Sequence, residues 1–323
     1  LVQTAPRKSC DRVLDLCCGS GIQGLVASRY SRDIVAVDLN PRAVRFARFN
    51  AQMNGIVNYE VRLGSLYEAV KNEEFDCILA NPPFVPSPEE SLKFRDGGAS
   101  GENILMAIVQ GAWQHLSPEG RLCIVTDLVD VPTYEEKLQS WLGGLDFYGL
   151  ILTTADRDEI LFSVPHCHAP FSQSLPEYNN ELDRWVQNFR QANLNAVNFG
   201  YIQVWKRELS GCDITTRTIH NPSKPVWGQV EEWLDQRILW DSEDADSLIL
   251  APHPDLRIVT EECPMGQAKQ CELSFPDDPF FTSYEVSCLI ADEIRRIALI
   301  EPTLLRRRGS TDYVWIENLH RLG

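Results

Sequence analysis

Residues 13–21 read VLDLCCGSG, and this stretch decides the fold. It begins with an apolar run typical of a buried strand, and Gly19 and Gly21 mark a tight turn directly after it. In an open α/β sheet, ligands bind at the carboxyl ends of the strands. Asp15 places a carboxylate near the end of this strand, where burial demands a cationic ligand or backbone donors. The stretch therefore predicts either a ligand-binding turn or an ordinary strand-to-helix turn with a capping acid.

A second strand of the buried type covers residues 33–39 (DIVAVDL), and Asp38 lies near its end. An acid at this position is suited to bind ribose hydroxyls, either of a dinucleotide or of another adenosyl ligand. The preceding turn also spells Gly19-x-Gly21-x-x-Gly24, the dinucleotide fingerprint, which is a weak signal by itself. The first two strands thus leave open a nicotinamide-dependent oxidoreductase and an enzyme that uses a different adenosyl ligand.

The end of the fourth predicted strand, residues 75–80 (FDCILA), separates these alternatives. Asn81-Pro82-Pro83-Phe84 follows it directly. The two prolines fix φ and lack N–H donors, so they hold the backbone rigid with carbonyls free to accept. Asn81 adds one carbonyl acceptor and two donors, which suits a clamp for a planar NH2 group, and Phe84 offers a ring for stacking. A proline-rich strand terminator is the plain alternative, and the glycine turn at this spacing disfavours it.

With these motifs in this order, residues 12 to 128 resemble class I S-adenosylmethionine-dependent methyltransferases. The stretch is similar to the group with an Asn-Pro-Pro-aromatic motif, which includes N5-glutamine protein methyltransferases and enzymes that methylate amino groups of nucleic acids. The Gly64-Ser65-Leu66 turn and the Asp96-Gly97-Gly98 loop also fall in the family's order. The resemblance implies an α/β fold: a Rossmann-like, doubly wound, seven-stranded methyltransferase sheet.

The resemblance also implies S-adenosylmethionine as the cofactor and assigns residues to it. The glycine turn and Asp15 would hold the methionine part, Asp38 the ribose, and Ser65 and Leu66 the adenine. The full set of implied cofactor contacts is Asp15, Cys17, Gly19, Gly21, Asp38, Leu39, Ser65, Leu66 and Asn81. The implied acceptor site is Asn81, Pro82, Pro83 and Phe84, with Asn81 as the catalytic residue. The chain departs from the family at Cys17, where a glycine is usual, and at Ser65, where an acid is usual.

The expected reaction is an in-line attack on the sulfonium methyl by an amide or amine nitrogen of a small molecule, peptide or protein. Asn81 could instead donate to an oxygen, which leaves an O-methyltransferase acting on a carboxylate or hydroxyl as the alternative. The alternative from another functional class is a binding protein that keeps this fold but has lost catalytic turnover. No metal is expected, because His166, Cys167 and His168 have no second ligand pair at zinc-finger spacing.

Charge and composition narrow the partners. The 323 residues carry 30 Lys and Arg against 46 Asp and Glu, a net charge of −16. Binding to nucleic acids draws most of its affinity from basic side chains, so a nucleic-acid partner is disfavoured. The sequence contains no run of 18 apolar residues, so it does not predict a membrane-spanning helix. The ten cysteines show no regular spacing, which indicates reduced thiols and a cytoplasmic setting.

The pattern divides the chain into a methyltransferase domain at residues 1–208 and a C-terminal α+β extension at 209–323. The extension is rich in proline and could be a substrate lid or a dimerisation module, so a homodimer is possible. A sixth strand of the main sheet is expected at 147–154 or at 159–164. The extension is expected to hold helices at 226–239 and 283–299, and short strands at 248–250 and 257–260.

Overall fold

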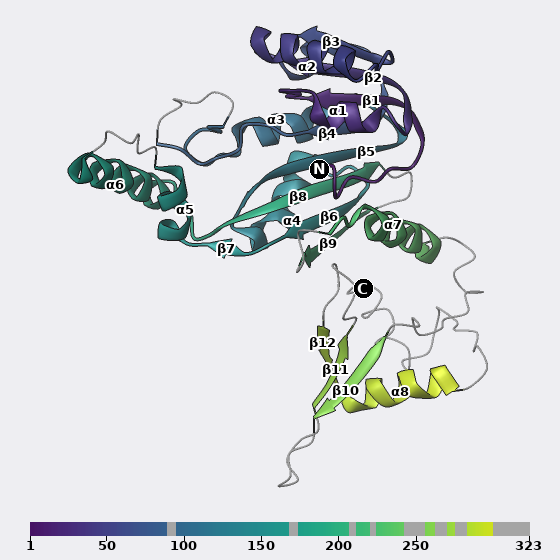
Figure 1. Ribbon diagram of the computed structural model, residues 1–323. Helices are drawn as coiled ribbons and strands as arrows, with labels where there is room; N and C mark the ends of the chain where they lie inside the picture. The colour runs from purple at the N-terminus through teal and green to yellow at the C-terminus, as the bar shows by residue number, and fades with distance from the viewer. Residues whose placement is uncertain are drawn as a thin grey trace. The chain divides into compact units, whose positions relative to one another are not determined.

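The structure is a computed structural model that describes residues 1–88, 95–167, 174–206, 211–219, 224–241, 256–261, 270–274 and 283–299. The chain divides into two compact units, Leu1–Arg217 and Thr218–Gly323 (Figure 1). The sheet of the first unit extends past residue 208, because its last strand follows that position. The functional division at residue 208 stays a prediction.

The first unit is built on one large, mainly parallel sheet. Its strands are β1 (Cys10–Leu16), β2 (Ser31–Asp38), β3 (Tyr59–Leu63), β4 (Phe75–Ala80), β5 (Leu116–Val129), β6 (Phe147–Thr153), β7 (Asp156–Arg157), β8 (Val197–Lys206) and β9 (Cys212–Thr218). Their order is β3-β2-β1-β4-β5-β8-β6-β9, with β7 also paired to β8. The pairs from β3 to β5 are parallel, and β8 runs antiparallel to both β5 and β6.

The predicted Rossmann-like α/β class is confirmed, but the predicted count of seven strands in this sheet is wrong: the described residues form nine strands in it. The two additional strands are β7 and β9, which join the sheet at different places. The two-residue strand β7 pairs with the start of β8, and β9 lengthens the sheet beyond β6. The central order of parallel strands, with β1 beside both β2 and β4, creates the switch point at which α/β folds bind ligands.

Helices cover both faces of this sheet. They are α1 (Ile22–Ala27), α2 (Pro41–Met53), α3 (Asn103–Ala112), α4 (Tyr134–Trp141), α5 (Glu159–His166) and α6 (Leu175–Gln191), with short 3-10 turns η1 (Leu66–Val70) and η2 (Val131–Thr133). On one face, Ala27 of α1 packs with Ile34 of β2. On the other, α3 and α4 bury Leu105 and Leu138 against Leu16 of β1. The unit is therefore a three-layered α/β/α structure (Figure 1).

Local capping explains where two of these helices begin. Asn40 accepts a hydrogen bond from the Arg42 N–H at 2.9 Å, and Pro41 follows it at the first helical position of α2. Asp158 caps α5 in the same way, accepting from the N–H groups of Ile160 and Leu161 at 2.9 and 2.8 Å. Because of this cap, residues 159–166 form a helix, and the prediction of a strand at 159–164 is wrong. The other predicted position for the sixth strand, 147–154, is confirmed by β6.

In its described residues, the second unit contains a small antiparallel sheet and two helices. Its elements are α7 (Trp227–Asp241), β10 (Arg257–Glu261), β11 (Gln270–Ser274), β12 (Ser283–Val286) and α8 (Cys288–Leu299), and the strand order is β10-β11-β12. The helix predicted at 283–299 is wrong in its first five residues, because residues 283–286 pair with β11 and the helix begins only at Cys288. The strand predicted at 248–250 lies outside the described residues. None of the described helices combines the length and apolar character that crossing a bilayer needs.

Candidate active site

The turn after β1 is shaped by residues in the left-handed backbone region. Gly19 and Gly21 have φ of 54° and 84°, and Cys17, although not a glycine, has φ of 54°. A Cβ atom on Gly21 would lie 2.6 Å from the Tyr59 hydroxyl oxygen. Burial and the neighbouring carboxylates of Asp38 and Asp15 raise the pKa of the Cys17 thiol to about 12, so this side chain stays neutral. The Cys17 side chain packs against the hydrophobic core, so the turn presents backbone rather than this side chain to a ligand.

Asp15 is fully buried beneath this turn. Its Oδ2 atom accepts a hydrogen bond from the Gly24 N–H at 2.8 Å, while its Oδ1 atom has no hydrogen-bond partner among the described residues. Burial raises the pKa of Asp15 to about 7; the Gly24 hydrogen bond opposes this rise and the nearby Asp38 carboxylate adds to it. A buried carboxylate with one unsatisfied oxygen fits a site that receives a cationic or hydrogen-donating ligand.

Asp38 joins the ends of β1 and β2. Its Oδ2 atom accepts from the Gly19 N–H at 2.9 Å and its Oδ1 atom from the Asn40 N–H at 2.8 Å. Each carboxylate oxygen has a further lone pair, so Asp38 can also accept from two ligand hydroxyls. Leu39, which follows it, is 70 % exposed beside this carboxylate. The acid predicted to hold a ribose thus lies directly beside the glycine turn.

Ser65 and Leu66 lie at the start of η1, after β3. Ser65 precedes the turn without forming a side-chain cap, and Leu66 has φ of 44°. Leu66 packs against the hydrophobic core that Leu16 shares. Since β3 and β2 are parallel neighbours, the ends of these strands lie at the same edge of the sheet as Asp38. The structure places all the predicted cofactor residues on neighbouring strand ends and turns at this edge.

Asn81 follows β4 and is exposed, whereas Pro82 is buried and Phe84 is half-buried. The Asn81 side chain makes no hydrogen bond to any residue that the structure describes, so its amide group is available to a substrate. Since β4 lies next to β1, Asn81 and the glycine turn share the carboxyl edge of the sheet.

The segment after Asn81 is held in place by the Asp96-Gly97-Gly98 loop. The Val85 N–H donates to the Arg95 carbonyl oxygen at 2.9 Å, and the Gly97 N–H donates to the Val85 carbonyl oxygen at 3.0 Å. Gly101, with φ of 79°, approaches so closely that a Cβ atom there would collide with the Phe84 carbonyl oxygen. The second glycine-rich loop therefore serves to fix the backbone of the predicted acceptor clamp.

Helix α6 braces this loop in turn. The Arg95 guanidinium lies over the Trp185 ring at 5.1 Å and donates to the buried Asp96 carboxylate at 2.6 Å. Asn188 donates to the Ala99 carbonyl oxygen at 3.1 Å. In Figure 1, α5 and α6 accordingly lie at the end of the unit where this loop emerges. The acceptor clamp thus depends on contacts with a helix about 100 residues later in the chain.

Sequence reasoning missed three residues at this edge. The Phe199 ring, on β8, lies 6.4 Å from the Phe84 ring, and it is 37 % exposed. Asp127, at the end of β5, is buried and receives a hydrogen bond from Arg157 at 2.5 Å. Burial nevertheless raises the pKa of Asp127 to about 6, because it outweighs the attraction of Arg157. An acid inside the apolar run at residues 121–128, which is typical of a buried strand, was the available signal for Asp127; nothing in the sequence signalled Phe199.

The residues considered as metal ligands have other contacts. The His166 ring stacks on Trp185 with centroids 5.4 Å apart, and its Nδ1 atom is 2.6 Å from the Phe162 carbonyl oxygen. Burial lowers the pKa of His166. The Cys167 thiol donates to the Ser163 carbonyl oxygen, and His168 lies outside the described residues. His166 therefore contributes to the packing of α5 against α6.

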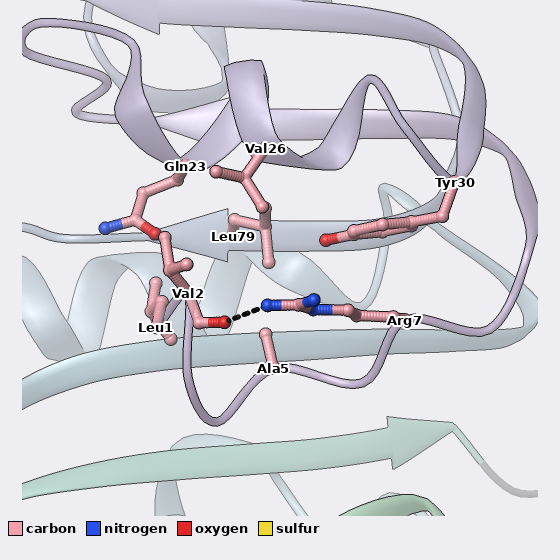
Figure 2. Close-up of a pocket in the computed structure, with 8 residues that line it drawn as sticks. All are labelled: Leu1, Val2, Ala5, Arg7, Gln23, Val26, Tyr30 and Leu79. Atoms are coloured by element: carbon pink, nitrogen blue, oxygen red, sulfur yellow. Dashed lines mark hydrogen bonds between the residues drawn. The ribbon is translucent and has the colours of Figure 1, made fainter. Parts of the chain in front are cut away.

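A separate small pocket lies between α1, β4 and the first residues of the chain (Figure 2). Arg7 crosses it and donates to the Val2 carbonyl oxygen at 2.9 Å, and the Tyr30 ring closes one side. Gln23 and Leu79 line it as well. The pocket contains none of the predicted site residues, so it is distinct from the strand-end site.

The comparison with protein families bears directly on this site. Residues 1–147 match the family described as the methyltransferase small domain. The predicted resemblance to class I methyltransferases is confirmed. The matched region contains every predicted cofactor and acceptor residue.

Three curated relatives refine the comparison. A release factor glutamine methyltransferase of Thermodesulfovibrio yellowstonii is 32 % identical over 123 residues, covering 34 % of this chain and 44 % of the relative. A ribosomal protein uL3 glutamine methyltransferase of Bradyrhizobium diazoefficiens is 30 % identical over 166 residues, covering 46 % and 51 %. A putative protein N5-glutamine methyltransferase of Methanocaldococcus jannaschii is 39 % identical over 100 residues, covering 29 % and 50 %. The chain spans about half the length of the curated relatives it matches.

Proposed function

We propose that this protein is an S-adenosylmethionine-dependent methyltransferase that methylates the side-chain amide nitrogen of a glutamine in a protein. The observation that carries the proposal is the pairing of two features at one sheet edge. An unsatisfied buried Asp15 oxygen lies beneath a glycine turn, and one strand away an exposed Asn81 begins a clamp braced by Arg95 and Trp185. The names of the three relatives support an amide of a protein as the acceptor.

The residues at the strand ends fit S-adenosylmethionine. The buried, unsatisfied Oδ1 atom of Asp15 can accept from the cationic methionine part, and the glycine turn lies directly above it. Asp38 can accept from both ribose hydroxyls while keeping its bonds to Gly19 and Asn40. Leu39 and Leu66 offer apolar surface to the adenine. When bound, this cofactor supplies an electrophilic methyl group on a sulfonium.

The chain's own part in the reaction is to orient the acceptor. The Asn81 side-chain oxygen and the Pro82 carbonyl oxygen can accept the two hydrogens of an amide NH2 group, which points the nitrogen at the methyl group. Such hydrogen bonds also increase the electron density on the nitrogen, and alignment at about 3 Å accounts for much of the rate. Phe84 would offer its ring to the planar acceptor, and Phe199 supports that ring with its centroid 6.4 Å away.

The net charge of −16 favours a protein over a nucleic acid as the acceptor, because phosphates would be repelled. The cytoplasmic setting expected from the cysteines, and a homodimer built through residues 209–323, remain predictions. An oxygen acceptor stays the alternative, because the Asn81 amide can donate as well as accept.

A methyl-transfer assay with the full chain tests the proposal. The acceptors would be a glutamine-containing protein, the same protein with that glutamine replaced by glutamate, and transfer RNA, each with radiolabelled S-adenosylmethionine. The proposal predicts label in the glutamine protein and recovery of N5-methylglutamine after proteolysis. Label in the glutamate variant would indicate O-methylation, and label in RNA alone would contradict a protein acceptor.

A further inference from the structure

Two cysteines of the second unit lie in direct contact. Cys271, in the middle of the three-stranded sheet, is 1 % exposed, and Cys288, the first residue of α8, is partly exposed. Their sulfur atoms are 2.9 Å apart, and the Cys271 thiol donates to the Cys288 sulfur. Both residues carry thiols in this structure. A disulfide has an S–S length of about 2.05 Å, so only a small movement separates this pair from a covalent bond.

The fold of the unit brings these sulfur atoms together. Cys271 pairs with Val286 across β11 and β12, so the two side chains share one face of the sheet. Two residues after Val286 the chain turns into α8, which buries Ala291 over the same face. Leu273, two positions along β11, is buried on that face as well. The contact is therefore a consequence of the strand register and of the point at which α8 begins.

The position of Cys288 favours the thiolate form. The first N–H groups of a helix lack intrahelical partners and carry partial positive charge, which stabilises an anion at this end. The helix α8 has 12 residues, and Ser287 precedes it, accepting from the Ile290 N–H at 3.3 Å. A partly exposed sulfur at a helix N-terminus, in contact with a second cysteine, combines an attacking and a resolving thiol.

We propose that Cys271 and Cys288 form a reversible intramolecular disulfide, with a low-molecular-weight disulfide such as oxidised glutathione as the oxidant. The Cys288 thiolate attacks one sulfur of the oxidant, forming a mixed disulfide and releasing one glutathione thiolate. Cys271 loses its proton and attacks the Cys288 sulfur, releasing the second glutathione. Two protein thiols are oxidised by two electrons, one disulfide is reduced to two glutathione molecules, and these carry away the two protons.

Other cysteines of the described chain are less suited to this reaction. Cys77 and Cys123 are fully buried in the core of the first unit, where an oxidant cannot reach them. Cys212 is exposed on β9, but no sulfur contact is found for it among the described residues. The new bond would close an 18-residue loop from Cys271 to Cys288. Restraining this loop in the unfolded state stabilises the second unit.

Thiol counting on the full chain tests the proposal. The protein is equilibrated with mixtures of reduced and oxidised glutathione, quenched with acid, denatured and alkylated, and its intact mass is measured. The reduced chain contains ten cysteines and takes ten labels, and the oxidised chain is expected to take eight. Peptide mapping should find one linked pair, Cys271 with Cys288. Calorimetry should show the second unit melting at least about 4 °C higher when oxidised.

Three variants make the result specific. Cys212→Ser should form the same linked pair. Cys288→Ser should abolish it, and Cys271→Ser should instead trap Cys288 as a mixed disulfide with glutathione, because the resolving thiol is missing. The proposal is overturned if wild-type protein keeps ten labels in excess oxidised glutathione, or if the linked pair contains a different cysteine. Circular dichroism of each reduced variant confirms that the chain is folded before these outcomes are read.

Discussion

Replacing Asn81 with alanine should remove most methyl transfer while leaving the fold and much of the cofactor affinity intact. The Asn81 side chain is exposed and makes no hydrogen bond to any described residue, so the free energy of unfolding should change by less than about 0.5 kcal/mol. Misplacing an acceptor by about 1 Å can cost roughly 100-fold in rate. That loss corresponds to about 2.7 kcal/mol of transition-state stabilisation. Urea unfolding, calorimetry with S-adenosylhomocysteine and initial rates of label transfer measure the three quantities separately.

Two further variants sharpen this prediction. Asn81→Asp keeps an acceptor oxygen and removes both donors, so some activity should remain on an amide acceptor and none on a carboxylate. Asn179→Ala, an exposed asparagine on α6, is the matched control and should leave the rate unchanged. The reasoning is refuted if both Asn81 variants retain near wild-type turnover on the true acceptor. It also fails if Asn81→Ala weakens the cofactor as much as it slows the reaction.

Three other changes test the cofactor edge and the clamp. Asp38→Ala should weaken S-adenosylhomocysteine binding by about 1.5–3 kcal/mol, roughly 10- to 150-fold, as measured by calorimetry. Asp33→Ala, which changes an exposed acid on the same strand, is the control and should leave this affinity unchanged. Gly101→Ala should destabilise the protein by about 1–3 kcal/mol in urea unfolding, because the φ of this residue is 79° and the new Cβ atom would collide with backbone. Gly228→Ala is the control and should not destabilise the protein, because Gly228 has open space around it. Burial raises the pKa of Asp15 from 3.8 to about 7, so the unfolded state loses this proton at lower pH than the folded state and the free energy of unfolding falls between pH 4 and 7. Asp15→Asn should therefore stabilise the protein more at pH 8 than at pH 4. An equal effect at both pH values would contradict the buried position of this carboxylate.

The features that sequence patterns predicted correctly depend on residues close together in the chain. The glycine turn follows β1 within a few positions, and Asp38 ends the next strand, so strand ends of a parallel sheet bring them together without knowledge of packing. The cap at Asn40 and the proline after it fixed the start of α2. The Rossmann-like sheet followed from the family resemblance, and the structure then showed that β4 lies next to β1, which places Asn81 beside the turn.

Contacts between distant segments could not be predicted. Trp185 reaches Arg95 from 90 positions away, and Phe199 reaches Phe84 through the antiparallel insertion of β8 beside β5. The apolar residues at 159–164 suited a strand as well as a helix, and only the two hydrogen bonds accepted by Asp158 decided for α5. The start of α8 was placed five residues early for a similar reason, since strand pairing with β11 depends on a partner elsewhere in the chain.

Calorimetric titration of the full chain with S-adenosylhomocysteine, and separately with NADH, tests the central claim most directly. Binding at the glycine turn, Asp15 and Asp38 predicts a saturable one-site isotherm with S-adenosylhomocysteine. Its affinity should fall in Asp38→Ala and be largely retained in Asn81→Ala. NADH should give no such isotherm. Saturable NADH binding without binding of S-adenosylhomocysteine would contradict the methyltransferase account and would instead favour the oxidoreductase that the Gly19-x-Gly21-x-x-Gly24 pattern left open.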